Sequence, residues 1–166
     1  EIIPEQVEED KVDLEVKVKE KPTGQFSIGG GFSSLDQLTA IANIAEGNLF
    51  GMGYMVRVRG QVGLRRTLGI MTFRNPSLWD GPTSFQIDGF STATNFLTYQ
   101  EERAGGTLQF GKAFSEYNVG SFTFVAESIT ISAPSSDAST SIVSQVGNQS
   151  TTGFRSSLFC DTRDNF

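Results

Sequence analysis

The sequence has no histidine and only one cysteine among its 166 residues. Without histidine, the usual zinc, haem and catalytic-triad sites lack their parts, and a single cysteine cannot form an internal disulfide. We therefore expect no enzymatic activity and no cofactor, and we assign Cys160 to packing. The net charge of −6 does not favour nucleic acid as a partner, because nucleic-acid-binding proteins carry clustered Lys and Arg.

Long hydrophobic runs are also missing. Hydrophobic residues make up 37% of the chain, and no stretch of about 20 apolar residues exists for a membrane helix. The apolar residues instead occupy alternate positions, most clearly in Gly24–Ser33 and Gly53–Gly63. One apolar and one polar face suit a strand with lipid on one side and water on the other. They suit a strand of a soluble sandwich or ligand-binding barrel equally well.

The first 23 residues differ from the rest of the chain. Glu1–Asp10 is rich in carboxylates and is predicted to be a solvated linker, since it has neither the basic start nor the apolar core of a signal peptide. Lys11–Lys21 alternates apolar and charged residues, which is typical of a strand with one face in water. The charge stops at Pro22, so we divide the chain into residues 1–23 and a second domain of residues 24–166.

Turn residues divide the second domain into eight predicted strands. In the seventh, the apolar positions change parity between Phe122, Phe124 and Ile129, Ile131. This change predicts a β-bulge near Glu127. The strands are expected at about 24–33, 38–46, 53–63, 67–75, 83–94, 104–114, 119–133 and 151–161.

Aromatic residues gather around one set of predicted turns, while the opposite end carries the longest polar loop, Pro134–Ser150. Membrane β-barrels show this asymmetry between an interfacial aromatic girdle and long extracellular loops, and soluble sandwiches do not. The sequence therefore favours an all-β, antiparallel, up-and-down transmembrane barrel in an outer membrane. The predicted girdle consists of Phe50, Tyr54, Phe73, Trp79, Phe85, Phe114 and Tyr117.

Charged residues are interpreted mainly as solvated groups. The four arginines at positions 57, 59, 65 and 66 are expected to face the lumen or a loop. Glu101, Glu102 and Glu116 lie near predicted turns, where solvated charge is the ordinary explanation. Arg163 is expected to form a local ion pair with the neighbouring Asp161 or Asp164 at the membrane rim.

Several segments of the chain occur together in a recognisable order: Val12–Glu20 followed by Thr23–Ser33, then Glu46–Gly53, Phe73–Leu78 and Asp161–Asn165. As an ordered set they resemble the BamA family of outer-membrane β-barrel assembly factors. The first pair is similar to the junction between the last POTRA module and the first barrel strand, the next two segments resemble the first two periplasmic turns, and the last resembles the element entering the turn after strand eight. The family's Val-Arg-Gly-Phe loop motif and closing strand do not occur in this chain.

The resemblance implies half of a sixteen-stranded barrel, preceded in residues 1–23 by the end of a periplasmic POTRA module. It also implies an integral outer-membrane location, the lipid bilayer and nascent outer-membrane proteins as partners, and contact with assembly-machinery lipoproteins. In this family, the first strand forms an edge that opens to clients. Carried over to this chain, the gate edge is Gly24, Gln25, Phe26, Ser27, Ile28, Gly29, Gly30, Gly31, Phe32 and Ser33.

Eight strands leave two ways to satisfy the sheet edges. The chain can close on itself as a narrow barrel, or two copies can pair strand one of each with strand eight of the other in a two-fold homodimer. Self-closure is slightly favoured for a monomer. A passive barrel or pore without insertase activity is the alternative function. The residues expected at the seam or dimer edge are Phe154, Ser156, Leu158, Cys160, Asp161 and Arg163.

Overall fold

The computed structural model describes residues 2–8, 11–16, 21–34 and 36–163 and contains two separate β-sheets. The smaller sheet is an antiparallel hairpin of β1 (Ile2–Glu8) and β2 (Lys11–Val16), in which Ile2 pairs with Val16 and Gln6 with Val12. The expected strand after Lys11 is thus present. The prediction of a linker over Glu1–Asp10 is wrong for Ile2–Glu8, because the backbone of these residues pairs with β2. The carboxylate-rich composition of the segment gave no sign of this pairing.

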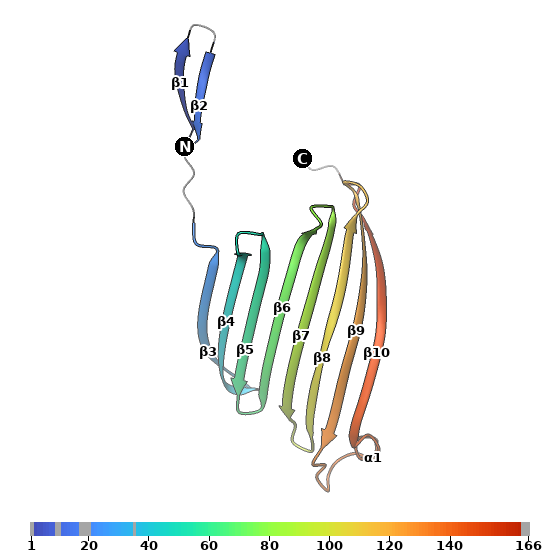
Figure 1. Ribbon diagram of the computed structural model, residues 1–166. Coiled ribbons are helices and arrows are strands. Elements are labelled where there is room, and N and C mark those ends of the chain that lie inside the picture. Colours follow the sequence, from blue (N-terminus) through green and yellow to red (C-terminus); the bar gives the residue numbers. More distant parts are fainter. Residues whose placement is uncertain (1, 9–10, 17–20, 35, 164–166) are drawn as a thin grey trace.

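The larger sheet contains eight antiparallel strands in sequence order, each paired only with its neighbours along the chain (Figure 1). All eight predicted strands are present. β4, β6 and β8 extend further than expected, since their pairing continues toward the turns. β8 begins at Gln100 and β10 at Gly147, so both shorten the predicted loops before them. The strands are β3 (Gly24–Ser33), β4 (Gln37–Leu49), β5 (Tyr54–Gly63), β6 (Arg66–Leu78), β7 (Thr83–Asn95), β8 (Gln100–Ala113), β9 (Asn118–Ser132) and β10 (Gly147–Cys160).

The only helix in the described part of the chain is a single turn, α1 (Thr140–Val143), in the loop between β9 and β10. Ser139 caps it by accepting a hydrogen bond from the backbone N–H of Ile142. No helix among the described residues has the length and hydrophobicity needed to cross a membrane.

The two faces of the sheet differ in chemistry, as the alternation predicts. On the apolar face, one row of paired residues begins with Phe26, Ile44, Val58 and Met71 and ends with Gly89, Gly106, Ala126 and Thr152. The next row begins with Gly24 and Glu46 and continues through Val56, Phe73, Ile87, Leu108, Phe124 and Phe154.

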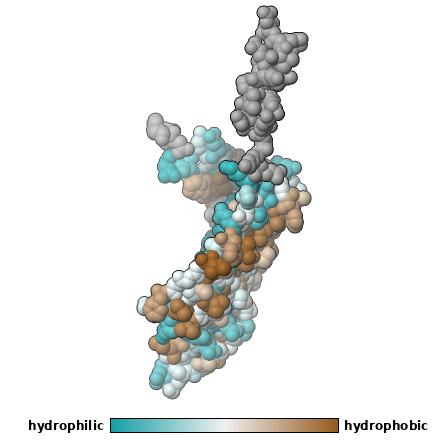
Figure 2. Space-filling model, turned by 90° about the vertical axis from the view of Figure 1, so that its left-hand side faces the viewer, coloured by the Kyte–Doolittle hydropathy of each residue, from teal (hydrophilic) through white to brown (hydrophobic). Residues whose placement is uncertain are grey.

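The large apolar residues therefore form a belt that crosses the hydrogen-bonded rows obliquely. Along the first row the apolar character is lost toward β10, whereas along the second it is gained. Strands of transmembrane barrels tilt by about 35–45° from the membrane normal, so a horizontal lipid layer must cross the rows in this way. Figure 2 shows hydrophobic residues gathered in an oblique band on the side where β3 lies.

The strands β7–β10 extend further than β3–β6 at the end of the sheet opposite the β4–β5, β6–β7 and β8–β9 turns (Figure 1). There the apolar face carries only small or polar residues, as in the row Ser91, Ala104, Ser128 and Ser150. The apolar residues lie on the other face, where Ile131 is only 7% exposed.

This reversal explains the parity change in β9. The predicted bulge near Glu127 is wrong, because β9 pairs with β8 and β10 without a register shift. Phe122 and Phe124 lie on the apolar face within the belt, and Ile129 and Ile131 lie on the opposite face beyond it. The strand stays regular while its surroundings change.

The sheet is open. Among the described residues, β3 pairs only with β4 and β10 only with β9, so the slight preference for self-closure is not what the structure shows. Closure of eight strands requires side chains that fill a narrow interior. On β3 the polar face offers mainly Gln25, Ser27, Gly29 and Gly31.

Candidate functional site

The first candidate site is the free edge of the sheet at β3. All ten residues of the predicted gate edge form this strand, and all ten are exposed. A Cβ added at Gly29 would meet no atom within 4 Å, so nothing in the sheet requires glycine there for lack of space. An edge strand presents unpaired backbone N–H and C=O groups that can pair with another strand.

The second free edge is β10, where all fourteen residues are exposed. Phe154, Ser156, Leu158 and Cys160 occupy alternate positions, and thus one face, of this strand. The packing role assigned to Cys160 is wrong, because its side chain is exposed at the edge. The structure does not bring the two predicted edges together, since β3 and β10 lie at opposite ends of the sheet (Figure 1).

An ion pair follows the end of β10. Arg163 donates from Nε to Asp161 Oδ1 at 2.9 Å and from its terminal nitrogen to Oδ2 at 2.7 Å, and its backbone N–H donates to Oδ1 at 3.1 Å. The ion pair predicted for Arg163 is confirmed with Asp161, while Asp164 lies outside the described residues. The Asp161 backbone N–H also donates to the carbonyl of Tyr117 at 2.9 Å, which joins this segment to the β8–β9 turn.

This ion pair gives a pH dependence. The Arg163 side chain, followed by its backbone N–H, lowers the pKa of Asp161 below the ordinary value for aspartate. A carboxylate with a lowered folded pKa stabilises the folded state above its unfolded pKa, and loses this effect as pH falls through the folded pKa. We expect the carboxyl 13C shift of Asp161 to titrate below the usual Asp range. Arg163→Gln should return it toward that range, and an unchanged titration would contradict the pairing.

The predicted aromatic girdle lies at the end of the sheet formed by the β4–β5, β6–β7 and β8–β9 turns. Phe50 and Trp79 are the most exposed of these residues, at 83% and 87%. Both have positive φ, 58° and 55°, at the first central position of a turn in which the second central residue is also left-handed. Bulky residues rarely adopt this conformation, so both turns hold an aromatic ring outward at a conformational cost.

The polar face is cationic, although the whole chain has a net charge of −6. The arginines at positions 57 and 59 lie there, as expected for a lumen-facing surface. The register places six arginines and three carboxylates on this face of strands β3–β10: Arg57, Arg59, Arg66, Arg74, Arg103 and Arg155, with Asp88, Glu101 and Glu127.

A hydrogen-bond cluster on this face was not predicted from the sequence. The half-buried Asp88 on β7 accepts bonds from Thr72 Oγ1 on β6 at 2.7 Å and from Thr107 Oγ1 on β8 at 2.8 Å. Gln86 Nε2 donates to both carboxylate oxygens, at 3.1 and 2.9 Å. The cluster ties three strands together. The sequence shows only that Asp88 is an acidic residue at a polar-face position, and this does not identify the residues that bond to it.

Comparison with known proteins decides the family. The model of the Omp85 superfamily domain matches residues 48–166. The chain belongs to the Omp85 superfamily. The resemblance to the BamA family is confirmed with it, because curated relatives that carry that name match this chain, one of them at 36% identity.

The relatives of this Omp85 chain are similar over most of its length. Outer membrane protein assembly factor BamA of Nitratidesulfovibrio vulgaris is 36% identical over 118 residues, which cover 71% of this chain and 15% of the relative. BamA of Neisseria meningitidis serogroup B is 26% identical over 129 residues, 74% of this chain and 16% of the relative. The chain therefore spans about a sixth of the length of these relatives.

The fold has a counterpart in the crystal structure of BamA from Haemophilus ducreyi lacking POTRA domains 1–3. The match covers 100% of this Omp85 chain and 36% of that chain, with a TM-score of 0.64 and 18% identity. At this identity the match establishes the fold alone. It agrees with the eight-stranded antiparallel sheet of this chain.

Proposed function

We propose that this chain forms part of an outer-membrane protein assembly factor and helps nascent outer-membrane proteins fold and insert, without enzymatic activity. The observation that carries this proposal is the fully exposed edge strand β3 in a chain of the Omp85 superfamily. The clients are outer-membrane proteins, and the lipid bilayer is the second partner. Residues 1–23 are assigned to the periplasmic side as the end of a POTRA module, where assembly-machinery lipoproteins are proposed to bind.

The physical basis is the cost of unpaired backbone in lipid. Each unsatisfied N–H or C=O group in the hydrocarbon layer costs several kcal/mol. When an incoming strand pairs with β3, the unpaired backbone groups of both strands form hydrogen bonds with one another. A free edge at β3 therefore lowers the barrier to insertion of the incoming strand. The three consecutive glycines at positions 29–31 offer little side chain to a neighbouring strand, which eases the exchange of one partner for another.

Cross-linking tests this proposal. Single cysteines would be placed at Gln25 and Ser27 on β3 in a Cys160→Ser background, and the protein in liposomes would be mixed with a stalled client barrel that carries a cysteine in its last strand. We expect disulfide adducts from both β3 positions. Cysteines at Gln86 and Gln109, which face the same side from the interior strands β7 and β8, should give none.

Kinetics provide a second measurement on the same proposal. The measured quantity is the rate of client folding in liposomes that contain the protein, relative to the rate in empty liposomes. Gly29→Val should reduce this rate enhancement, because a β-branched side chain stiffens the edge. Gly153→Val is the matched control on β10, since a Cβ at either position meets no atom within 4 Å. Adducts that form only away from β3, or equal rates for the two variants, would contradict a gate at β3.

The free edges also allow a second copy to bind. Because β3 and β10 run in opposite directions, β3 of one copy can pair antiparallel with β10 of another at both junctions, which gives sixteen strands with two-fold symmetry. We propose this homodimer for the chain when no other strands complete the barrel. A particle mass of one chain in detergent would exclude it.

A further inference from the structure

A cavity lies on the polar face, at the end of the sheet beyond the apolar belt. It has a volume of about 810 Å³ and is bounded by β6, β7 and β8 and by the loops that follow β3, β5 and β7. This volume is within the usual range for small-molecule sites, about 300–1,000 Å³. Neither the predicted gate edge nor the predicted seam contributes a residue to it.

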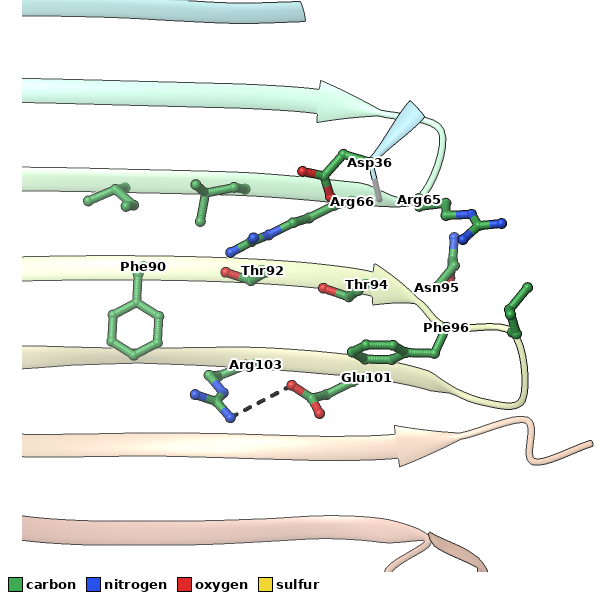
Figure 3. A pocket seen from close by; sticks show the side chains of 13 residues that line it. Asp36, Arg65, Arg66, Phe90, Thr92, Thr94, Asn95, Phe96, Glu101 and Arg103 are labelled. Atoms are coloured by element: carbon green, nitrogen blue, oxygen red, sulfur yellow. Dashed lines mark ion pairs between the residues drawn. The ribbon is translucent and has the colours of Figure 1, made fainter. Parts of the chain in front are cut away.

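Polar groups gather in one part of this cavity. The register sets Thr94 between Arg66 and Glu101, and Thr92 between Leu68 and Arg103. Figure 3 shows the side chain of Arg66 reaching toward Thr92, with Arg103 on the other side of that threonine. Two guanidinium groups and two hydroxyls thus face one space, and all four can donate hydrogen bonds to an anion.

The charges of the cavity favour an anion. Its lining includes Arg65, Arg66 and Arg103 against only two carboxylates, Asp36 and Glu101. The contact between Arg103 and Glu101 is long, at 3.7 Å, and the Arg103 side chain is 44% exposed. Guanidinium groups bind carboxylates and phosphates through paired hydrogen bonds.

The remaining wall of the cavity is apolar. Leu68 and Ile70 on β6 and Phe90 on β7 lie side by side on this face, with Ile70 paired to Phe90. Phe96 and Leu97 from the β7–β8 loop border the cavity as well. Phe96 is fixed by stacking on Tyr99, with ring centroids 4.6 Å apart, and by a backbone bond from its N–H to the Tyr99 carbonyl at 2.9 Å.

From this arrangement we propose that the cavity binds a single-chain anionic amphiphile. Its anionic head lies between Arg66 and Arg103, and its hydrocarbon chain lies along Leu68, Ile70 and Phe90. A peptide segment fits less well, because each of its residues brings an N–H and a C=O that need partners, while the polar groups of the cavity are confined to one end. This inference is independent of the proposed gate at β3.

Binding of a fluorescent fatty acid tests the site. The probe is cis-parinaric acid, and the matched ligand is its methyl ester, which has the same hydrocarbon chain without the charge. With the full chain in a neutral detergent, we expect saturable binding of the acid, weakened by salt, and about tenfold weaker binding of the ester, the effect of one charge-assisted interaction.

Substitutions then locate the site. Arg66→Gln and Arg103→Gln should each weaken the acid about tenfold and leave the ester unchanged, whereas Phe90→Ala should weaken both ligands. Arg57→Gln is the control, because Arg57 lies on the same cationic face but outside this cavity. Circular dichroism would verify that each variant folds.

Several outcomes would overturn the proposal. Equal binding of acid and ester by the unmodified protein would remove the role of the arginines, and this test does not depend on any variant folding. An equal loss with Arg57→Gln would indicate attraction to the cationic face as a whole. Binding of an acidic, leucine-rich peptide that the acid fails to displace would assign the cavity to a protein segment.

Discussion

Leu108→Arg is expected to destabilise the membrane-inserted sheet by about 2–4 kcal/mol, the cost of a cation on the lipid-facing side of a barrel near the bilayer centre. Leu108 lies on the apolar face of β8 within the belt, in the same row as Phe124 and Phe154. The guanidinium has no water there and must distort the bilayer or displace the strand. Urea titration in liposomes, followed by circular dichroism, measures the change.

Ala104→Arg is the matched control on the same strand and face. Ala104 is exposed and lies beyond the belt, in the row with Ser91, Ser128 and Ser150, so its replacement is expected to cost no more than about 1 kcal/mol, as near the membrane interface. Equal losses for the two variants would mean that the belt does not follow the oblique path. This pair therefore tests where the membrane crosses β8 as well as which face meets it.

Gly105→Ala is expected to cost about 2–3 kcal/mol, the upper part of the usual range for overpacking. A Cβ at Gly105 would lie 2.5 Å from the Ala126 carbonyl oxygen and 2.8 Å from the Glu127 Cα. Both atoms belong to the backbone of β9, which cannot rotate away as a side chain can. The methyl group therefore has room only if β8 and β9 separate and weaken their ladder. Unfolding midpoints in detergent measure the loss.

The control for this substitution is Gly89→Ala on β7. A Cβ at Gly89 would meet nothing within 4 Å, so the substitution removes unfolded-state entropy without creating a clash and should be neutral or slightly stabilising. If both alanine variants lose the same stability, the close approach of β8 and β9 at Gly105 is not a constraint on the fold.

The eight strands could be predicted from the sequence because alternation is a local property. In β3 Phe26, Ile28 and Phe32 occupy one face, with Gln25, Ser27 and Ser33 on the other, and the predicted bounds of Gly24–Ser33 agree with the structure. The strand Ile2–Glu8 was missed because its evidence lies in pairing with β2, not in its own composition.

The surroundings of each strand were harder to predict than the strands. In β9 the apolar parity changes because the strand leaves the lipid belt, and a single sequence does not distinguish that event from a bulge. Asp88 shows the same limit, since its partners Thr72 and Thr107 belong to two other strands. Both features depend on which residues the register sets side by side, and register is a property of pairs of strands.

The pairing of every strand with its sequence neighbours has a consequence for how the sheet forms. Each ladder closes a hairpin of two consecutive strands, so the entropy lost in closing any one loop does not grow as the sheet widens. Proteins dominated by such local contacts reach the native state faster than those that must join distant segments. The sheet can therefore grow one hairpin at a time, and only joining β3 to β10, or to a strand of another molecule, requires a search between distant segments.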